Sequence, residues 1–70
     1  MVNERICMAV EDSGLKQNFI AEKVGISEPS LSALLAGKRK VYVDEFFALC
    51  QVLHKKPDEL YNYQRSKRAV

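Results

Sequence analysis

The chain contains no tryptophan, one histidine and two cysteines, so few of its side chains suit metal or redox chemistry. Cys7 and Cys50 are far apart, and neither belongs to a Cys-x-x-Cys pair. This spacing, with a single histidine, excludes the usual metal-site patterns. Each cysteine lies among apolar residues, which predicts two reduced thiols in a core. No metal and no cofactor are expected.

Long apolar runs are also lacking. No apolar stretch approaches the roughly 18 residues that a membrane-spanning helix needs. The opening residues, MVNER, do not show the basic and then apolar pattern of a signal peptide. We therefore expect a cytoplasmic protein with no membrane partner.

The groupings on which enzyme chemistry depends are missing as well. The sequence has no paired carboxylates with a partner base, no His/Cys/Ser constellation and no glycine-rich phosphate loop. His54 falls at an expected helix end, where a histidine favours the negative end of the helix dipole. We expect a protein that is not an enzyme and that binds no small-molecule ligand.

The length allows one domain at most. The chain has 70 residues, of which 47% are hydrophobic, enough for a packed core. A domain this small buries only roughly 60% of the surface that its unfolded chain exposes, so dimerisation would add stability. We expect the domain to cover residues 1–63, with a basic tail over residues 64–70.

Apolar residues recur every three or four positions, and no strand-like alternation is present. This periodicity, cut by Gly14, Gly25, Gly37 and Pro57, predicts an all-α fold of five short helices. The expected helices span 3–12, 16–24, Ser27 to just before Gly37, 45–54, and a short segment from Pro57. The side chains expected to pack inside are Ile6, Ala9, Val10, Ile20, Val24, Ile26, Leu31, Leu34, Leu35, Phe46, Leu49, Cys50 and Leu53.

Residues suited to helix starts stand at two of these boundaries. Ser27 can accept a hydrogen bond from an orphan backbone N–H, and Glu28 suits the positive end of the dipole. Pro29 is tolerated because first-turn N–H groups have no intrahelical partner. Asp44 is the expected cap of the fourth helix.

Basic charge is gathered in the second half of the chain. Residues 1–35 hold three basic and five acidic side chains, a net −2, whereas residues 36–70 hold eight and four, a net +4. The cations cluster at Lys38-Arg39-Lys40 and in the stretch from Arg65 to Arg68. Such clusters are candidate phosphate contacts, although short basic clusters are also common on ordinary solvated surface.

The most informative pattern lies within residues 15–40. Two short helices are joined by Val24-Gly25-Ile26-Ser27, where Gly25 permits the turn and the small Ala21 permits close approach. The chain resembles the Cro/C1-type (XRE) helix-turn-helix family over about residues 5–61. The matching motifs are Gly14-Leu15-x-Gln17, Ile20-Ala21-x-x-Val24-Gly25-Ile26-Ser27, Ser30-Leu31-Ser32, Gly37-Lys38-Arg39, Phe46-x-x-Leu49-Cys50-x-x-Leu53 and Asp58-Glu59-Leu60. The resemblance implies a lambda-repressor-like domain.

The resemblance also implies roles for particular positions. In the family, the first turn of the third helix and the residues one turn later face base edges. The matching positions here are Ser27, Glu28, Pro29, Ser32 and Ala33. The start of the second helix and the loop after the glycine contact phosphates. The positions that match are Lys16, Gln17, Lys38, Arg39 and Lys40.

The chemistry of these side chains fits that division. Lysine and arginine neutralise phosphates without reading sequence. Glu28 could accept from cytosine N4, and Pro29 and Ala33 could touch a thymine methyl. The face has no Arg, Gln or Asn for bidentate base contacts, so shape and dimeric binding would supply the remaining specificity. The alternative to base contact is that Glu28 only favours the positive end of the helix dipole and that Ser27 only caps the helix.

One departure from the family concerns the core. Many members pair an arginine on the first helix with a glutamate late in the third. The corresponding residues here are Val10 and Leu35. Matched apolar residues can replace a buried ion pair without loss of stability. We predict that these two side chains pack together and that neither is largely exposed.

A possible dimer surface comes from aromatic residues near the C-terminus. Phe47, Tyr61 and Tyr63 could form an exposed apolar patch, or could be an ordinary core edge. Val41 and Tyr42 could line the same interface or pack under the loop.

These features predict a sequence-specific transcriptional regulator, in particular a repressor. It would bind an inverted repeat in double-stranded DNA as a homodimer, with the two third helices about 34 Å apart. The alternative is a protein-interaction module with the same fold, such as an antitoxin or an anti-repressor.

Overall fold

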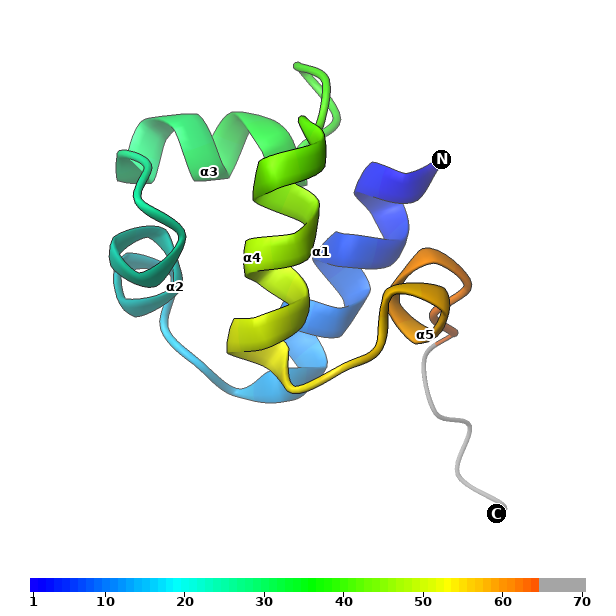
Figure 1. The fold of residues 1–70 in the computed structure, drawn as a ribbon. Helices are drawn as coiled ribbons and strands as arrows, with labels where there is room; N and C mark the ends of the chain where they lie inside the picture. The colour runs from blue at the N-terminus through cyan, green and yellow to red at the C-terminus, as the bar shows by residue number, and fades with distance from the viewer. Residues whose placement is uncertain (65–70) are drawn as a thin grey trace, which may run out of the picture.

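The computed structural model describes residues 1–64, which form five short helices (Figure 1). They are α1 (Val2–Ser13), α2 (Gln17–Val24), α3 (Glu28–Leu35), α4 (Val43–Leu53) and α5 (Pro57–Tyr61). No strand occurs in this part of the chain, so the predicted all-α fold of five helices is confirmed. Apart from Gln64, the predicted basic tail lies outside the described residues.

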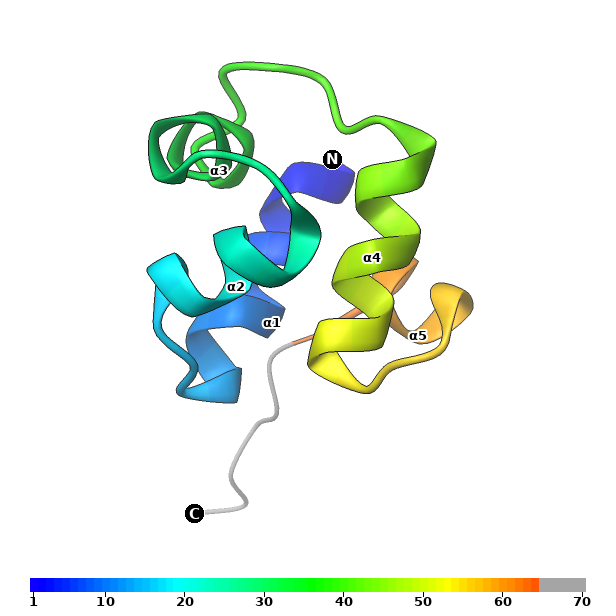
Figure 2. The same cartoon turned by 60° about the vertical axis from the view of Figure 1, so that its left-hand side comes forward.

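The helices wrap around a single core. α2 packs against both α3 and α4, and α1 contacts α3, α4 and α5. In Figures 1 and 2, α2 and α5 lie on opposite sides of α4, and a long loop carries the chain from α3 to the start of α4. We call residues 36–42 the α3–α4 loop. This arrangement leaves the outer side of α3 without a covering helix.

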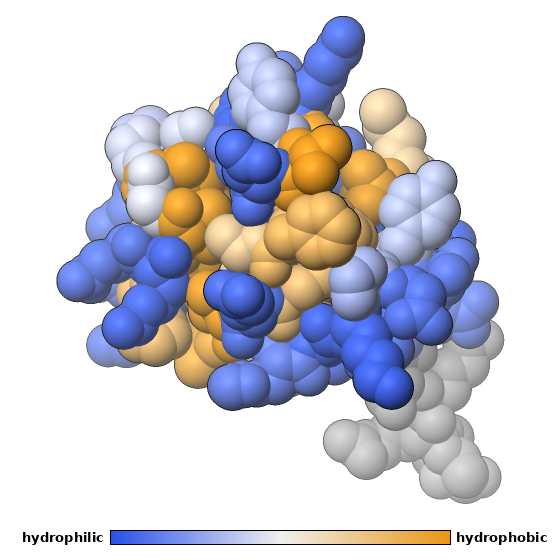
Figure 3. All heavy atoms as spheres, viewed as in Figure 1, coloured by the Kyte–Doolittle hydropathy of each residue, from blue (hydrophilic) through white to orange (hydrophobic). Residues whose placement is uncertain are grey.

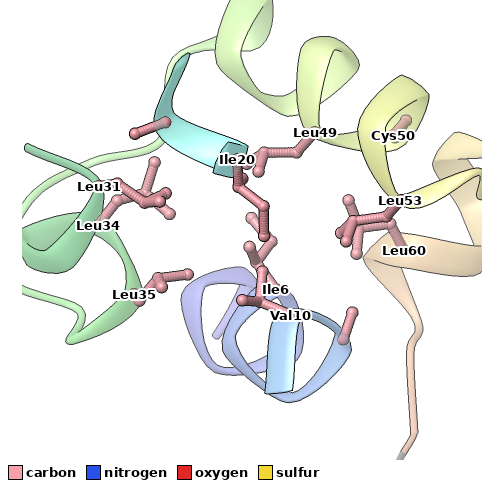
Figure 4. Close-up of a cluster of buried hydrophobic side chains, with 12 residues drawn as sticks. Ile6, Val10, Ile20, Leu31, Leu34, Leu35, Leu49, Cys50, Leu53 and Leu60 are labelled. Atoms are coloured by element: carbon pink, nitrogen blue, oxygen red, sulfur yellow. The ribbon is translucent and has the colours of Figure 1, made fainter. Parts of the chain in front are cut away.

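The core contains side chains from all five helices (Figure 4). Six are fully buried, and four of these belong to α1, α2 or α3. Val24, Ile26 and Phe46 are partly buried against this core. The predicted inward-facing set is therefore confirmed. The buried apolar residues are Ile6, Ala9, Val10, Ile20, Ala21, Leu31, Leu34, Leu35, Leu49, Cys50, Leu53 and Leu60.

The structure also bears on the predicted packing of Val10 with Leu35. Val10 is 4% exposed and Leu35 is 8% exposed, and both belong to the same buried cluster. Figure 4 shows Leu35 extending from α3 toward α1. The outcome that would have refuted the predicted packing, two exposed side chains, does not occur.

Two helix boundaries confirm the local signals in the sequence. The Ser27 hydroxyl accepts a hydrogen bond from the Ser30 amide at 3.3 Å, which makes Ser27 the N-cap of α3. Beyond the end of α3, Gly37 has a φ of 76°, a left-handed conformation that glycine adopts without strain. Its amide donates to Leu34 O, and the Lys38 amide donates to Ala33 O. This pair of bonds is a Schellman motif, which ends the helix and directs the chain into the α3–α4 loop.

The start of α4 differs from the prediction. Tyr42, not Asp44, is the N-cap residue, and the helix already begins at Val43. The Tyr42 amide donates to Glu45 Oε1 at 3.1 Å. A glutamate at the third helical position can reach back to the cap in this way and satisfy an orphan N–H. The helix starts earlier than predicted because Glu45 supplies this bond, which does not depend on Asp44.

Neither cysteine forms a disulfide within residues 1–64. Cys50 is buried, and this burial raises the pKa of its thiol. Cys7 is only partly buried, and its Sγ lies 3.8 Å from Glu11 Oε2. Within residues 1–64, no helix is both long and apolar enough to cross a membrane.

The core position of Leu34 leads to a test of the fold. Leu34→Ala is expected to lower the free energy of unfolding by about 2–5 kcal/mol, because it removes a fully buried side chain and leaves a cavity. Ser32→Ala, on the exposed face of the same helix, is expected to change it by no more than about 0.5 kcal/mol. Urea unfolding followed by circular dichroism measures both changes. Equal effects of the two substitutions would contradict the assigned orientation of α3.

Candidate nucleic-acid interface

The outward face of α3 carries the residues expected to read bases. Leu31, Leu34 and Leu35 are buried on the inner face. Residues three and four positions apart share one side of a helix, so the remaining positions turn away from the core. Among the expected base-facing residues, Ala33 is half-buried and the other four are exposed, namely Ser27, Glu28, Pro29 and Ser32.

The turn between α2 and α3 sets the angle at which α3 is presented. Gly25 has a φ of 88°, and its amide and that of Ile26 both donate to Ala21 O, at 2.8 and 3.0 Å. Ala21 is buried, and a larger side chain there would push the two helices apart. Ile26 is partly buried against the core, which anchors the middle of the turn. A short turn with these two hydrogen bonds and a buried anchor holds the two helices as one unit.

Most of the expected phosphate contacts lie on the surface in two groups. Lys16 and Gln17 are exposed at the start of α2, where Lys16 is the N-cap residue. Lys38 and Lys40 are exposed in the α3–α4 loop. The first turn of a helix also presents backbone N–H groups and a positive dipole end, both of which favour an anion. Each group therefore has chemistry suited to a phosphate.

Arg39, another expected phosphate contact, forms its bonds within the protein. Its Nε donates to Ser30 O at 3.1 Å, and its Nη1 donates to Lys40 O at 2.8 Å. Nη1 and Nη2 also bind the two carboxylate oxygens of Glu45 at 2.9 and 3.0 Å. These bonds use four of the five N–H donors of the guanidinium. In this structure Arg39 bonds within the protein, and the exposed cations of the loop are Lys38 and Lys40.

The ion pair changes the titration of Glu45. The hydrogen bonds from Arg39 lower the pKa of the Glu45 carboxyl, against the opposing effect of burial. The Tyr42 amide adds a smaller effect in the same direction. The pair is well shielded, with side-chain exposures of 22% for Arg39 and 14% for Glu45. Glu45 therefore stays ionised at neutral pH and neutralises Arg39.

Asn3 is a residue of this region that sequence reasoning missed. It is the one polar residue buried within residues 1–64, at 5% exposure. Its Nδ2 donates to Leu34 O at 2.9 Å and to Arg39 O at 3.0 Å. The signal in the sequence was the position of Asn3, three residues before Ile6 and seven before Val10, which places it on the inward face of α1. That spacing indicates burial but not the bonding partners.

The aromatic residues expected at a dimer surface lie in two places. Phe47 and Tyr61 are 51% and 61% exposed, and they line one groove. Tyr63 is not part of it: its hydroxyl donates to Asp12 Oδ2 at 2.6 Å, and its main-chain oxygen accepts from Arg5 at 2.8 Å. Figure 3 shows apolar side chains gathered over α4 on this face. The residues that line the groove, which we call the apolar groove, are Val2, Val41, Val43, Phe46, Phe47 and Tyr61.

The described residues hold no cluster of three or more His, Cys, Asp or Glu side chains that could bind a metal ion. His54 ends α4 in a left-handed conformation, with a φ of 56°, and its side chain is exposed. Its predicted place at a helix end is confirmed.

Two consecutive helices joined by a tight glycine turn, the second with a polar outward face, define a helix-turn-helix domain. The helix-turn-helix family model matches residues 8–60, well over half of the chain. The chain belongs to the Cro/C1-type helix-turn-helix family of DNA-binding regulatory domains, which confirms the resemblance inferred from its motifs. No match was found among the curated proteins or the solved structures compared with it.

The lowered pKa of Glu45 leads to a stability test in acid. A carboxyl whose pKa is depressed by folding stabilises the fold above its unfolded pKa, near 4.3, and loses this contribution as the pH falls through the folded value. Wild type is therefore expected to exceed Glu45→Gln in stability by about 1–2 kcal/mol at pH 7, with the difference shrinking below about pH 4. Denaturant unfolding at a series of pH values measures it. Asp44→Asn, an exposed neighbour, is the control, and a Glu45→Gln difference that is constant with pH would contradict the ion pair.

Proposed function

We propose that the protein is a sequence-specific transcriptional regulator that represses by occupying its operator as a homodimer, with α3 in the major groove. The observation that carries this proposal is the outward face of α3, whose exposed polar residues lie next to a loop with two exposed lysines. Membership of a DNA-binding family supports it. The simplest repressor activity of such a five-helix domain is physical exclusion of other proteins from the DNA.

Affinity would come from phosphate contacts on both sides of α3. The exposed Lys16 and Gln17 precede it, and the exposed Lys38 and Lys40 follow it. Each neutralised phosphate releases counterions, so binding would weaken steeply with salt. These contacts fix the register of α3 on the duplex without distinguishing one sequence from another.

Specificity would come from a small reading face. Glu28 could accept a hydrogen bond from cytosine N4, and Pro29 and Ala33 could contact thymine methyl groups. The Ser27 hydroxyl already accepts from the Ser30 amide, which leaves its proton free to donate to a phosphate or a base. So few base contacts give limited direct reading in each half-site, and DNA shape would supply part of the rest.

A second copy of the chain would supply the remaining specificity. The apolar groove exposes Phe47 and Tyr61 to solvent, and aromatic side chains of this kind are enriched at interfaces. Homodimers have closed two-fold symmetry, so the same groove on both copies would form one interface. The dimer would then present two copies of α3 to successive major grooves on one side of the duplex.

The same groove is the observation that favours a second candidate function. An exposed apolar surface on a small domain could hold a different protein, as in an antitoxin or an anti-repressor. The two functions differ in whether the protein binds DNA by itself.

Selection of bound sequences from a random duplex pool tests the leading proposal. Purified protein is expected to recover an inverted repeat whose half-sites are about one helical turn apart, at low and then at physiological salt. The reason is that a two-fold dimer imposes its symmetry on the site. Weak binding with no recovered motif would contradict the proposal and favour the protein-interaction module.

The dimer surface has a separate test. Phe47→Glu is expected to convert the protein to a monomer in sedimentation equilibrium and to weaken operator binding at least tenfold, about 1.4 kcal/mol, because it buries a charge in the interface. Phe19→Glu is the matched control, since Phe19 is also exposed, at 42%, but lies on α2 outside the groove. A wild-type chain that stays monomeric on its operator would contradict this interface.

A further inference from the structure

Three polar side chains form hydrogen bonds that fix the α3–α4 loop to the helices beneath it, and we call these three side chains the loop brace. They are Asn3 of α1, Arg39 of the loop itself and Glu45 of α4. Together they bond to α3 at two carbonyls, those of Ser30 and Leu34. The brace therefore joins three helices and the loop through bonds that do not involve the hydrophobic core.

Most of these bonds end on main-chain atoms. Asn3 donates to the carbonyl of Arg39 at 3.0 Å, Arg39 donates to that of Lys40 at 2.8 Å, and Glu45 accepts from the amide of Tyr42 at 3.1 Å. Bonds to the main chain fix the path of the loop directly. Along this path the three consecutive basic residues differ in exposure: Arg39 is half-buried, whereas Lys38 and Lys40 are exposed.

We infer that Arg39 is a positioning residue, which the loop brace holds inside so that Lys38 and Lys40 are presented to DNA phosphates at fixed places. This inference rests on the proposed DNA-binding function. An unbraced loop would have to lose conformational freedom when it bound DNA, whereas a braced loop has already lost it on folding. Arg39 suits this task better than lysine because its planar fork can bind a carboxylate and main-chain carbonyls together.

A competing role for Arg39 predicts the opposite change in DNA affinity, so the direction of that change tests the inference. If Arg39 instead swung out to contact phosphate, Glu45 would be a competitor that weakens DNA binding. Removing the charge of Glu45 would then free the guanidinium and strengthen binding. If Arg39 is a brace, removing that charge loosens the loop and weakens binding, even though the protein loses a negative charge.

The experiment measures the affinity of the full chain for a labelled mixed-sequence duplex over a range of salt concentrations. Glu45→Gln is expected to bind roughly five- to tenfold more weakly than wild type, with no steeper salt dependence. Arg39→Lys is expected to weaken binding to a similar extent although it keeps the charge. Lys38→Ala, which removes a phosphate contact, is expected to reduce the slope of log affinity against log salt by about 0.9.

Asp44→Asn is the matched control, because it removes an equal charge from the adjacent, exposed position of α4. It is expected to bind as tightly as wild type or slightly more tightly. Circular dichroism at the assay temperature checks that each variant is folded, and if Glu45→Gln is not, Arg39→Lys decides the comparison. Tighter DNA binding by Glu45→Gln, or unchanged binding by Arg39→Lys, would contradict the positioning role of Arg39 and leave the proposed DNA-binding function intact. Failure of the wild-type chain to bind any duplex at low salt would overturn the proposed function, and this role of the brace with it.

Discussion

The burial of one face of α3 is the constraint on which the rest of the structure depends. α3 has eight residues, and a helix this short is not stable in water by itself. It forms because Leu31 and Leu34 are fully buried against the other helices and Leu35 is nearly so. The same burial fixes the rotation of the helix about its axis. The residues from Ser27 to Pro29, together with Ser32, are therefore held facing outward.

The C-terminal end of α3 needs polar partners as well as apolar ones. The last carbonyls of a helix have no intrahelical donors. Here the amides of Gly37 and Lys38 and the side chain of Asn3 supply donors to the carbonyls of Leu34 and Ala33. Asn3 thus connects the first helix of the chain to the point where α3 ends. Core packing sets which face of α3 is outward, and these bonds set where the following loop goes.

The electrostatics of the surface follow from the same loop. Three consecutive basic residues would give the loop a charge of +3, but Glu45 neutralises Arg39, and two exposed lysines remain. The net charge of the chain is only +2, and the loop offers two exposed lysines to phosphates. A single copy would make modest phosphate and base contacts, which is consistent with a regulator that binds as a pair of copies. The proposed pairing would use the apolar groove, in which Phe47 and Tyr61 are exposed.

The sequence by itself determined the helices, most of the core and the outward position of the residues expected to face bases. These features depend on residues within about one or two turns of each other, such as the cap at Ser27, the turn at Gly25 and the leucine spacing in α3. Only the tertiary structure decided the inward role of Arg39, the bonds of Asn3 and the separation of Tyr63 from the apolar groove. The bonds of Asn3 and Tyr63 join residues 31 to 58 positions apart, and those of Arg39 depend on how the loop returns to α4. Their partners are set by how the helices pack, because a polar side chain bonds to whatever donor or acceptor the packed neighbours bring within about 3 Å.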